Sequence, residues 1–309
     1  MKAIRILKFG PTDVMLSTDV ERPTPGAGQV LVRIKAAGVG PWDALVREGK
    51  SGLPQKLPLT PGSDLAGTVE AIGTGVTGLS VGEAVYGMTD ESFTGAYAEF
   101  ALASANMLAR KPESLSFIEA AGAPVVAVTA WQMLFEYARI KAGHTVLING
   151  GAGNVGGYAV QMARDASVNV IATARTEDLD FVKSLGAQTV VDYHKEELEN
   201  SISPVDVVID TVGGETRERS LRILKPRGIL VTVVTPPPVK TGSIGGVRVE
   251  FFYVEVTTAR LNTISQLFDS GKLKAHTGTI LPLDEARLAH EMLAGAAHAR
   301  GKIVLKVAA

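Results

Sequence analysis

The clearest chemical signal in this sequence is a glycine-rich turn between an apolar strand and a helix. Residues 145–149 (TVLIN) are largely apolar, and Gly151, Gly153 and Gly156 follow with the spacing G-x-G-x-x-G. In that context the first glycine permits a tight turn, the second lets the backbone approach a pyrophosphate, and the third lets the helix pack on the strand. The N–H groups that begin the helix also attract negative charge. The pattern therefore predicts a dinucleotide-binding site.

The end of the next strand indicates which dinucleotide binds. NAD sites usually carry an acidic residue there, about 20 residues after the glycines, and it bonds the ribose 2′-hydroxyl. This chain has Ala174 and Arg175 instead, with Glu177 and Asp178 just beyond. A small residue followed by a guanidinium suits a 2′-phosphate, so we predict NADP(H) rather than NAD(H). The alternative is that Arg175 is an exposed residue at a helix start and that the two acids only cap the next helix.

Composition excludes several kinds of site and partner. The 309 residues include no cysteine, so a disulfide, a catalytic thiol and a thiolate zinc site are all excluded. The five histidines are scattered, so we expect no bound metal, and we expect His290 and His298 to be solvated polar residues. A net charge of −1 gives no electrostatic reason to expect nucleic acid.

The sequence also shows no stretch typical of a signal peptide or a membrane-spanning helix. The first residues alternate as a strand does, unlike a signal peptide, and the apolar runs are far shorter than the roughly 20 residues that span a bilayer. We therefore expect a soluble, cytoplasmic protein with no membrane partner.

The elements that must position the glycine turn fall into two regions. Residues 1 to 105 are rich in short strands separated by Gly/Pro clusters, which predicts a small barrel or sandwich. The strands are expected at residues 2–7, 29–35, 67–72, 83–86 and 97–102.

Helical spacing begins near residue 116, and six strands then alternate with helices, which predicts a parallel, doubly wound α/β sheet. Helices are expected at 117–121, 125–139, 155–166, 177–185, 216–224 and 257–270, and strands at 145–149, 169–174, 188–192, 205–211, 228–234 and 247–254. A helix at 283–293 and a strand at 302–307 close the chain. We predict one domain from residues 1–122 with 271–309 and a second from residues 123–270.

Several motifs together resemble those of a known family. The segments are 36–43 (AAGVGPWD), 61–67 (PGSDLAG), 128–131 (VTAW), 151–157 (GAGNVGG), 210–214 (DTVGG), 224–228 (LKPRG) and 299–302 (ARGK). With these, nearly the whole chain resembles the zinc-free quinone oxidoreductase branch (zeta-crystallin-like) of the medium-chain dehydrogenase/reductase superfamily. The resemblance implies a GroES-like β-barrel domain, a Rossmann domain, an active site in the cleft between them, and a homodimer.

The sequence departs from the family pattern at two informative positions. Gly40 stands where zinc-dependent relatives have a thiolate ligand, and Ser63 stands where they have a histidine. No Lewis-acid metal is then expected to polarise an alcohol or carbonyl. Many quinone-reductase relatives have asparagine at the position of Gly40, and tyrosines of the substrate loop are missing between Val46 and Asp64. The identity of the substrate therefore cannot be transferred from the family.

The resemblance also implies cofactor contacts. It places Gly153, Asn154 and Val155 at the pyrophosphate, and Arg175 and Tyr193 near the 2′-phosphate. Further candidates lie at the ends of two strands, where ligands of open α/β sheets bind; they are Thr211, Val212, Gly213, Val233, Val234 and Thr235. Two more, Thr129 and Lys302, resemble cofactor contacts of the family. Each of the last two has a plain alternative, because Thr129 could be a buried helix hydroxyl and Lys302 a solvated lysine at a strand start.

The acceptor side is less defined. Asp43 and Asp64 are the acids nearest the expected cleft, but Asp43 could simply cap a short helix over residues 44–48, and Asp64 could belong to an interior hydrogen-bond network. The predicted substrate pocket contains Gly40, Trp42, Phe93, Phe251 and Phe252, although aromatic residues are more often part of a core.

These observations predict an NADPH-dependent, metal-free reductase of quinones or α,β-unsaturated carbonyls. Hydride adds to an electrophilic carbon, N–H or O–H donors stabilise the charge on the carbonyl oxygen, and water can supply the proton. The alternatives are a biosynthetic enoyl reductase of a carrier-bound or secondary-metabolite substrate, and a non-catalytic NADPH-binding structural or regulatory protein.

Overall fold

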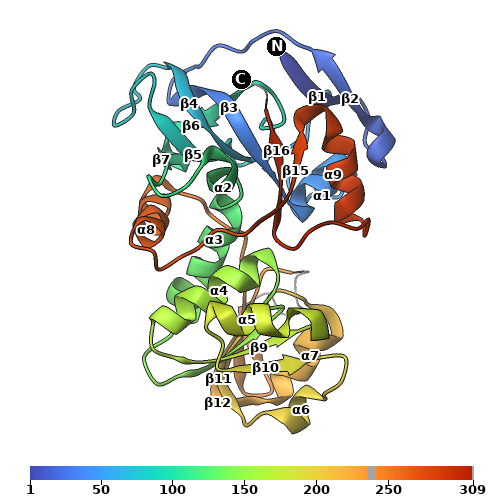
Figure 1. The fold of residues 1–309 in the computed structure, drawn as a ribbon, viewed down its shortest axis with the longest axis vertical. Coiled ribbons are helices and arrows are strands. Elements are labelled where there is room, and N and C mark those ends of the chain that lie inside the picture. The colour runs from blue at the N-terminus through green and yellow to red at the C-terminus, as the bar shows by residue number, and fades with distance from the viewer. Residues whose placement is uncertain (235–240, 308–309) are drawn as a thin grey trace. The chain divides into compact units, whose positions relative to one another are not determined.

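The computed structural model describes residues 1–234 and 241–307. The chain divides into two units, whose elements are labelled in Figure 1. The first unit comprises Met1–Val125 and the described chain from Val256 onward, and the second comprises Val126–Glu255. The sequence predicted two domains, and the first boundary between them, after Val125, lies three residues from its expected place after residue 122.

The second boundary, before Val256, differs from its predicted place after residue 270, because helix α8 (Thr258–Asp269) belongs to the first unit. The sequence assigned this helix to the nucleotide-binding domain. Its contacts explain the difference: Thr258 Oγ1 donates a hydrogen bond to Leu108 O at 2.7 Å, and Tyr86 Oη donates to Leu261 O at 2.7 Å. The last helix of the alternating series is thus held by strands of the barrel.

Strand β3 (Gln29–Val39) is the centre of the first unit. Eleven residues long, it pairs antiparallel with β4, β6 and β16, in a sheet of order β15-β16-β3-β4-β5-β7. The other strands are β1 (Lys2–Ile6), β2 (Met15–Asp19), β4 (Asp64–Ile72), β5 (Ala84–Met88), β6 (Phe100–Ser104), β7 (Leu108–Arg110), β15 (Thr277–Pro282) and β16 (Lys302–Lys306). Because β16 pairs with β3, the C-terminal strand returns to the first unit, as the predicted domain division requires.

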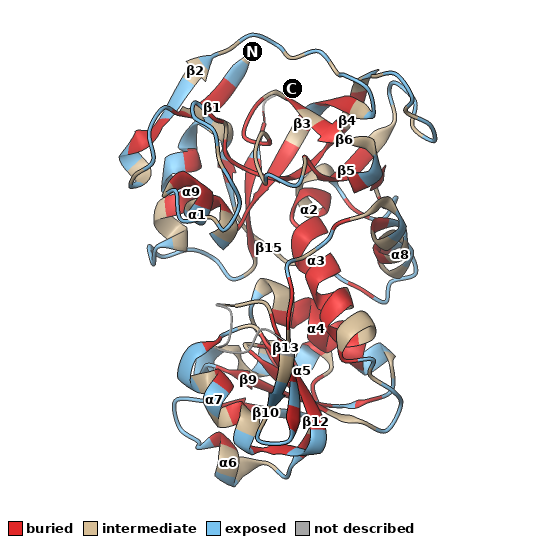
Figure 2. Ribbon diagram, turned by 180° about the vertical axis from the view of Figure 1, so that it is seen from behind, coloured by how far each residue is buried: buried red, intermediate tan, exposed pale blue. Residues whose placement is uncertain are grey.

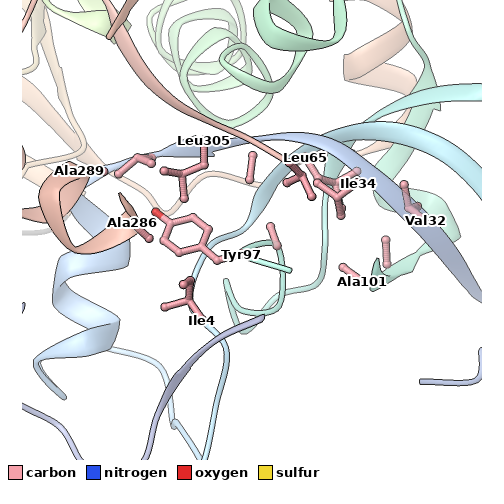
Figure 3. Close-up of a cluster of buried hydrophobic side chains, with 14 of the residues drawn as sticks. Ile4, Val32, Ile34, Leu65, Tyr97, Ala101, Ala286, Ala289 and Leu305 are labelled. Atoms are coloured by element: carbon pink, nitrogen blue, oxygen red, sulfur yellow. The ribbon is translucent and has the colours of Figure 1, made fainter. Parts of the chain in front are cut away.

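The core of the first unit fills one side of this sheet. Figure 3 shows Tyr97 among aliphatic side chains that include Ile4 and Leu305. Tyr97 is fully buried, as are Ile34 and Leu65, and Figure 2 shows that strands of both units are largely buried. Burial of these apolar side chains stabilises the barrel through the hydrophobic effect.

Short helices flank the barrel. They are η1 (Thr12–Val14), α1 (Pro41–Arg47), η2 (Ala105–Met107), α2 (Phe117–Ala121), η5 (Leu283–Glu285) and α9 (Ala286–Leu293). Helix α2 has the bounds expected from the sequence, since Ser116 and Glu119 form a capping box. Helix α1 begins earlier than expected, at Pro41, because proline suits the first helical position.

The prediction of a solvated His290 is wrong. This residue on α9 is 1% exposed, and its Nδ1 lies 3.2 Å from Arg47 Nη1. Burial, reinforced by the positive charge of Arg47, lowers the pKa of His290 to about 3.

The second unit is the predicted doubly wound sheet. Its strand order is β10-β9-β8-β11-β12-β14-β13, in which the first six strands are parallel and β13 pairs antiparallel with β14. The strands are β8 (Thr145–Asn149), β9 (Asn169–Ala174), β10 (Thr189–Asp192), β11 (Val205–Asp210), β12 (Leu224–Thr232), β13 (Thr241–Ile244) and β14 (Val247–Phe251). The sequence order reverses between β8 and β11, which is where ligands bind in such sheets.

Helices connect these strands. They are α3 (Pro124–Trp131), continued by the π-helix η3 (Gln132–Tyr137), then α4 (Asn154–Asp165), η4 (Thr176–Asp178), α5 (Leu179–Leu185), α6 (Leu198–Ser201) and α7 (Gly214–Arg222). Figure 1 shows α4 and α5 side by side over the sheet, where α4 packs on β8 and β9 and α5 on β10. Within the described ranges, no helix combines the length and apolar character that a membrane span requires.

Candidate functional site

The glycine turn between β8 and α4 is built by close backbone contacts. Gly150 adopts φ 75°, in the left-handed region, and its N–H donates to Thr173 Oγ1 at 3.0 Å. The N–H of Gly151 donates to Thr173 O at 2.9 Å. A Cβ on Gly156 would lie 2.0 Å from Gly150 O, and one on Gly151 would lie 2.9 Å from the Ala172 Cβ. These two motif glycines therefore allow strand and helix to approach, which the sequence predicted for Gly156. Sequence reasoning missed Gly150 and Thr173, which set the turn.

The start of α4 is open to a ligand. Gly153, at its N-cap, is exposed and provides no side-chain cap, Asn154 and Val155 are partly exposed, and the first turn has no acidic residue. A Cβ on Gly153 would meet only Gly150 O, at 3.2 Å, among the protein atoms within 4 Å. The amides that begin a helix have no partner within it and carry partial positive charge. This surface fits a pyrophosphate.

Arg175 and Tyr193 lie together at the ends of β9 and β10. They meet because Ala174 pairs with Asp192 in register, so the next residue of each strand is its neighbour. Arg175 Nε donates to Tyr193 Oη at 3.0 Å, and the Arg175 side chain is 61% exposed. Glu177 Oε1 lies 3.9 Å from Arg175 Nη1, a weak and exposed pairing. An accessible guanidinium and phenol fit a phosphate on the adenosine ribose.

Part of the alternative explanation agrees with the structure, because Arg175 is exposed at the N-cap of the 3₁₀ turn η4, and Glu177 and Asp178 lie in that turn. Asp178 occupies the N-cap of α5 but makes no side-chain cap hydrogen bond there. Glu177 lies in the 3₁₀ turn η4 and is itself exposed. The exposed position of Arg175 therefore agrees both with a 2′-phosphate contact and with the alternative of a solvated residue at a helix start.

The switch point between β8 and β11 holds two buried polar residues that the sequence reasoning missed. Asn149 and Asp210 pair in register and are each 0% exposed. Asp210 Oδ1 accepts hydrogen bonds from the N–H groups of Val212 at 3.2 Å and Gly213 at 2.9 Å, and Thr211 Oγ1 donates to Asn149 O at 2.6 Å. Asp210 thereby shapes the predicted segment 211–213. A polar residue at the carboxyl end of each of these mainly apolar strands was the available signal.

The remaining residues predicted for the second unit have mixed outcomes. Val233 and Val234 are partly exposed, and Thr235 lies outside the described residues. Thr129 is 4% exposed on α3, consistent with a buried helix hydroxyl. Phe251 is 9% and Phe252 6% exposed. Both phenylalanines have the burial expected of core residues.

In the first unit, one carboxylate oxygen of Asp43 belongs to a buried hydrogen-bond network. Its Oδ2 accepts from the N–H of Gly40 at 2.8 Å and from Tyr97 Oη at 3.0 Å, and the residue is fully buried. Burial raises the pKa of Asp43 to about 7, against the opposing effects of the Gly40 amide and the positive charge of Lys302. The alternative role of Asp43 as a helix cap is therefore confirmed, and Tyr97 is a partner that the sequence did not indicate.

A second network joins Lys302, Asp64, Trp42 and Ser63. Lys302 Nζ lies 3.1 Å from Asp64 Oδ2, and its side chain is 3% exposed, so the alternative of a solvated lysine is wrong. The same ammonium lies 4.3 Å from the centroid of the Trp42 ring. Trp42 Nε1 donates to Ser63 Oγ at 2.9 Å. Asp64 Oδ1 also accepts from the N–H of Val125 at 3.1 Å, which confirms an interior network for Asp64.

Charge and burial oppose each other at Asp64. Desolvation raises the pKa of Asp64, while the ammonium of Lys302 and the Val125 amide act in the other direction.

Phe93, the last predicted pocket residue, has φ 59° and packs against the barrel core.

The residues at the expected metal position do not fit zinc. The chain has no cysteine, and Ser63 already accepts a hydrogen bond from Trp42. Across residues 1–234 and 241–307, no group of three histidine, aspartate or glutamate side chains could hold a metal.

Comparisons with known proteins agree with this architecture. Residues 26–113 match the alcohol dehydrogenase GroES-like domain, and residues 185–305 match a family described as zinc-binding dehydrogenase. The chain is 33% identical to the quinone oxidoreductase of Sus scrofa, with 99% of this chain and 97% of that protein covered.

Two further relatives extend the comparison. The chain is 33% identical to the chloroplastic NADPH-dependent alkenal/one oxidoreductase of Arabidopsis thaliana, covering 99% of this chain and 79% of that protein. The solved structure of the quinone oxidoreductase from Coxiella burnetii superposes with a TM-score of 0.91 at 34% identity, covering 100% of this chain and 99% of that one.

Proposed function

The chain belongs to the quinone oxidoreductase branch of the medium-chain dehydrogenase/reductase superfamily, and from this premise we propose that it is an NADPH-dependent reductase of quinones or α,β-unsaturated carbonyls. The observation that carries the proposal is the open glycine turn with Arg175 and Tyr193 beside it. The amides of Asn154 and Val155 would bind the pyrophosphate, and Arg175 with Tyr193 would bind the 2′-phosphate.

The reaction is assigned from the chemistry that this chain's residues allow. When bound, the nicotinamide supplies the hydride. Position 40 has no side chain, and the Ser63 hydroxyl is engaged by Trp42, so neither offers a metal ligand for activating an alcohol. A conjugated acceptor does not need one, because its electrophilic carbon accepts hydride while the charge spreads onto a carbonyl oxygen. Water supplies the proton.

Relatives support the acceptor class. One is named as a quinone oxidoreductase and another as an NADPH-dependent alkenal/one oxidoreductase. Both substrate types are electron-poor conjugated carbonyls, which is the property that the proposal uses. The family's expected homodimer is part of the proposal and can be measured by sedimentation.

An acceptor panel tests the proposal. NADPH oxidation is followed with 1,4-quinones, 2-alkenals and aryl enones, each compared with NADH as the donor. We expect turnover of several acceptors and a preference for NADPH. Tight NADPH binding with no acceptor consumed would contradict the catalytic assignment and support the non-catalytic alternative. Turnover of a single bulky enone would favour the alternative of a biosynthetic enoyl reductase.

A further inference from the structure

Position 40 has an extended backbone that any residue could adopt. Gly40 has φ −132° and ψ 162°. A glycine is therefore not required by the local conformation. Glycine is required at position 40 because of a neighbouring side chain. A Cβ on Gly40 would lie 2.3 Å from Trp42 Cζ2, 2.4 Å from Cη2 and 2.5 Å from Cε2. The six-membered ring of Trp42 thus occupies the space that a side chain at position 40 would take.

Three contacts hold the indole in this place. Its Nε1 donates to Ser63 Oγ at 2.9 Å, its ring carries the Lys302 ammonium 4.3 Å from the centroid, and its edge packs on the backbone of Gly40. Cation–π attraction and a hydrogen bond both orient an aromatic ring. Trp42 nevertheless remains partly exposed, although Ser63 and Lys302 are buried.

The lysine is fixed as firmly as the indole. Asp64 pairs with its ammonium at 3.1 Å, and two glycines leave room for its stem. A Cβ on Gly38 would lie 3.1 Å from Lys302 Cε, and a Cβ on Gly122 would lie 3.2 Å from Lys302 Cγ. The position of the indole is therefore set by parts of the chain that are far apart in sequence.

We propose that Gly40 and Trp42 form a specificity-determining pair, in which the indole replaces a side chain at position 40 and presents a rigid aromatic surface to the acceptor. Such a surface contacts flat, conjugated rings better than short aliphatic chains, because aromatic rings attract each other beyond their buried area. The pair selects aryl quinones and aryl enones over short 2-alkenals. This inference rests on the proposed function for the identity of the substrate, but not for the packing of the pair.

The packing is tested without any acceptor. Gly40→Ala and Trp42→Val are made singly and together, and unfolding is followed by calorimetry. Gly40→Ala alone should lower the melting temperature by about 3–8 °C, because the added methyl overpacks the indole. In the Trp42→Val background it should have almost no effect. Equal losses in both backgrounds would overturn the pairing.

Fluorescence gives a second reading of the same pair. The chain has two tryptophans, so Trp131→Phe leaves Trp42 as the only indole. Gly40→Ala in that background should shift the emission and increase quenching by acrylamide, since the indole has to leave its place. An unchanged spectrum would contradict the displacement.

The specificity role is tested by the ratio of kcat/KM for 1,4-naphthoquinone to that for 2-hexenal. Trp42→Val should lower this ratio by about two- to tenfold, which is the range for one aromatic contact. Trp42→Phe, which keeps an aromatic ring but loses the Ser63 hydrogen bond, should recover part of it. Phe9→Val removes a different, exposed aromatic side chain of the first unit and should leave the ratio unchanged.

The outcomes separate the two proposals. If Trp42→Val slows both acceptors equally, the specificity role is overturned while the proposed function stands. If the wild-type protein consumes no acceptor, the proposed function fails and the specificity role fails with it, even when the stability cycle confirms the packing.

Discussion

In the second unit the groups proposed to bind the cofactor are accessible, whereas in the first unit the charged groups of Lys302, Asp64 and Asp43 are buried. Arg175 is 61% exposed, and the amides that begin α4 have no side-chain cap. Lys302 is 3% exposed and Asp64 0%, and they are paired with each other. The second unit thus offers polar groups to a ligand. The first unit uses its polar groups on one another, and they hold an aromatic ring in place.

This difference has an energetic basis. Exposed amides and a guanidinium lose little when no ligand is present, because water solvates them. A buried ammonium without its carboxylate would carry the full desolvation cost. Substitutions in the first unit should therefore act mainly on stability, and those in the second mainly on ligand affinity.

The largest effect is expected from Asp64→Asn, which leaves the buried Lys302 ammonium without its counter-charge. Breaking one side of a buried ion pair typically costs about 3–5 kcal/mol of unfolding free energy. Chemical denaturation measures this loss. The double variant Asp64→Asn/Lys302→Met should regain much of it, and a double variant no more stable than the single one would show that the charge pairing is not the cause.

Gly156→Ala should have a smaller effect and is an expected exception in the second unit, because Gly156 is buried in backbone packing and is not one of the exposed groups. The added Cβ would lie 2.0 Å from Gly150 O, so helix and strand must separate. Overpacking of this kind costs about 1–3 kcal/mol. NADPH affinity should fall as well, because the helix start moves. Gly157→Ala on the same helix is a suitable control, because a Cβ there would make only ordinary contacts, 3.5 Å from Leu185 Cδ1 and 3.8 Å from Gly151 O.

Arg175→Ala should change affinity without changing stability. Its guanidinium is solvated, but it would make charge-assisted hydrogen bonds to the 2′-phosphate, which are worth about 1.5–3 kcal/mol. Titration by fluorescence should show NADPH binding weakened by about tenfold or more, with NADH binding unchanged. Retained NADPH affinity would remove Arg175 from the 2′-phosphate site.

The smallest expected effect, taken per pH unit, is the pH dependence contributed by Asp43. Its pKa rises to about 7 in the folded state from an ordinary value of 3.8. The folded protein then holds a proton that the unfolded chain releases, so stability falls as pH rises through this window, by up to about 1.4 kcal/mol per pH unit. Asp43→Asn should flatten the slope measured by urea unfolding between pH 4 and 7. An unaltered slope would assign the pH dependence to other groups.

Prediction from the sequence was most complete where the determinants are local. Gly151, Gly153 and Gly156 lie within six residues of one another, and the strand and helix around them have the expected periodicity. The six parallel strands were found for the same reason. Strands β2, β7, β13 and β15 were missed, because they are short or partly exposed edge segments with little alternation.

The sequence by itself determined a doubly wound α/β unit with a glycine turn, a β-rich unit and the absence of any thiolate ligand, since glycine spacing, periodicity and composition express these directly. Only the tertiary structure decided the role of the first unit's polar residues. Lys302 and Asp64 are 238 residues apart, and Asp43 and Tyr97 are 54 apart. A residue type does not reveal whether its charge is buried or solvated, because that depends on neighbours brought together by folding. The same holds for Gly40, whose requirement for glycine comes from the position of the Trp42 ring and not from its own backbone.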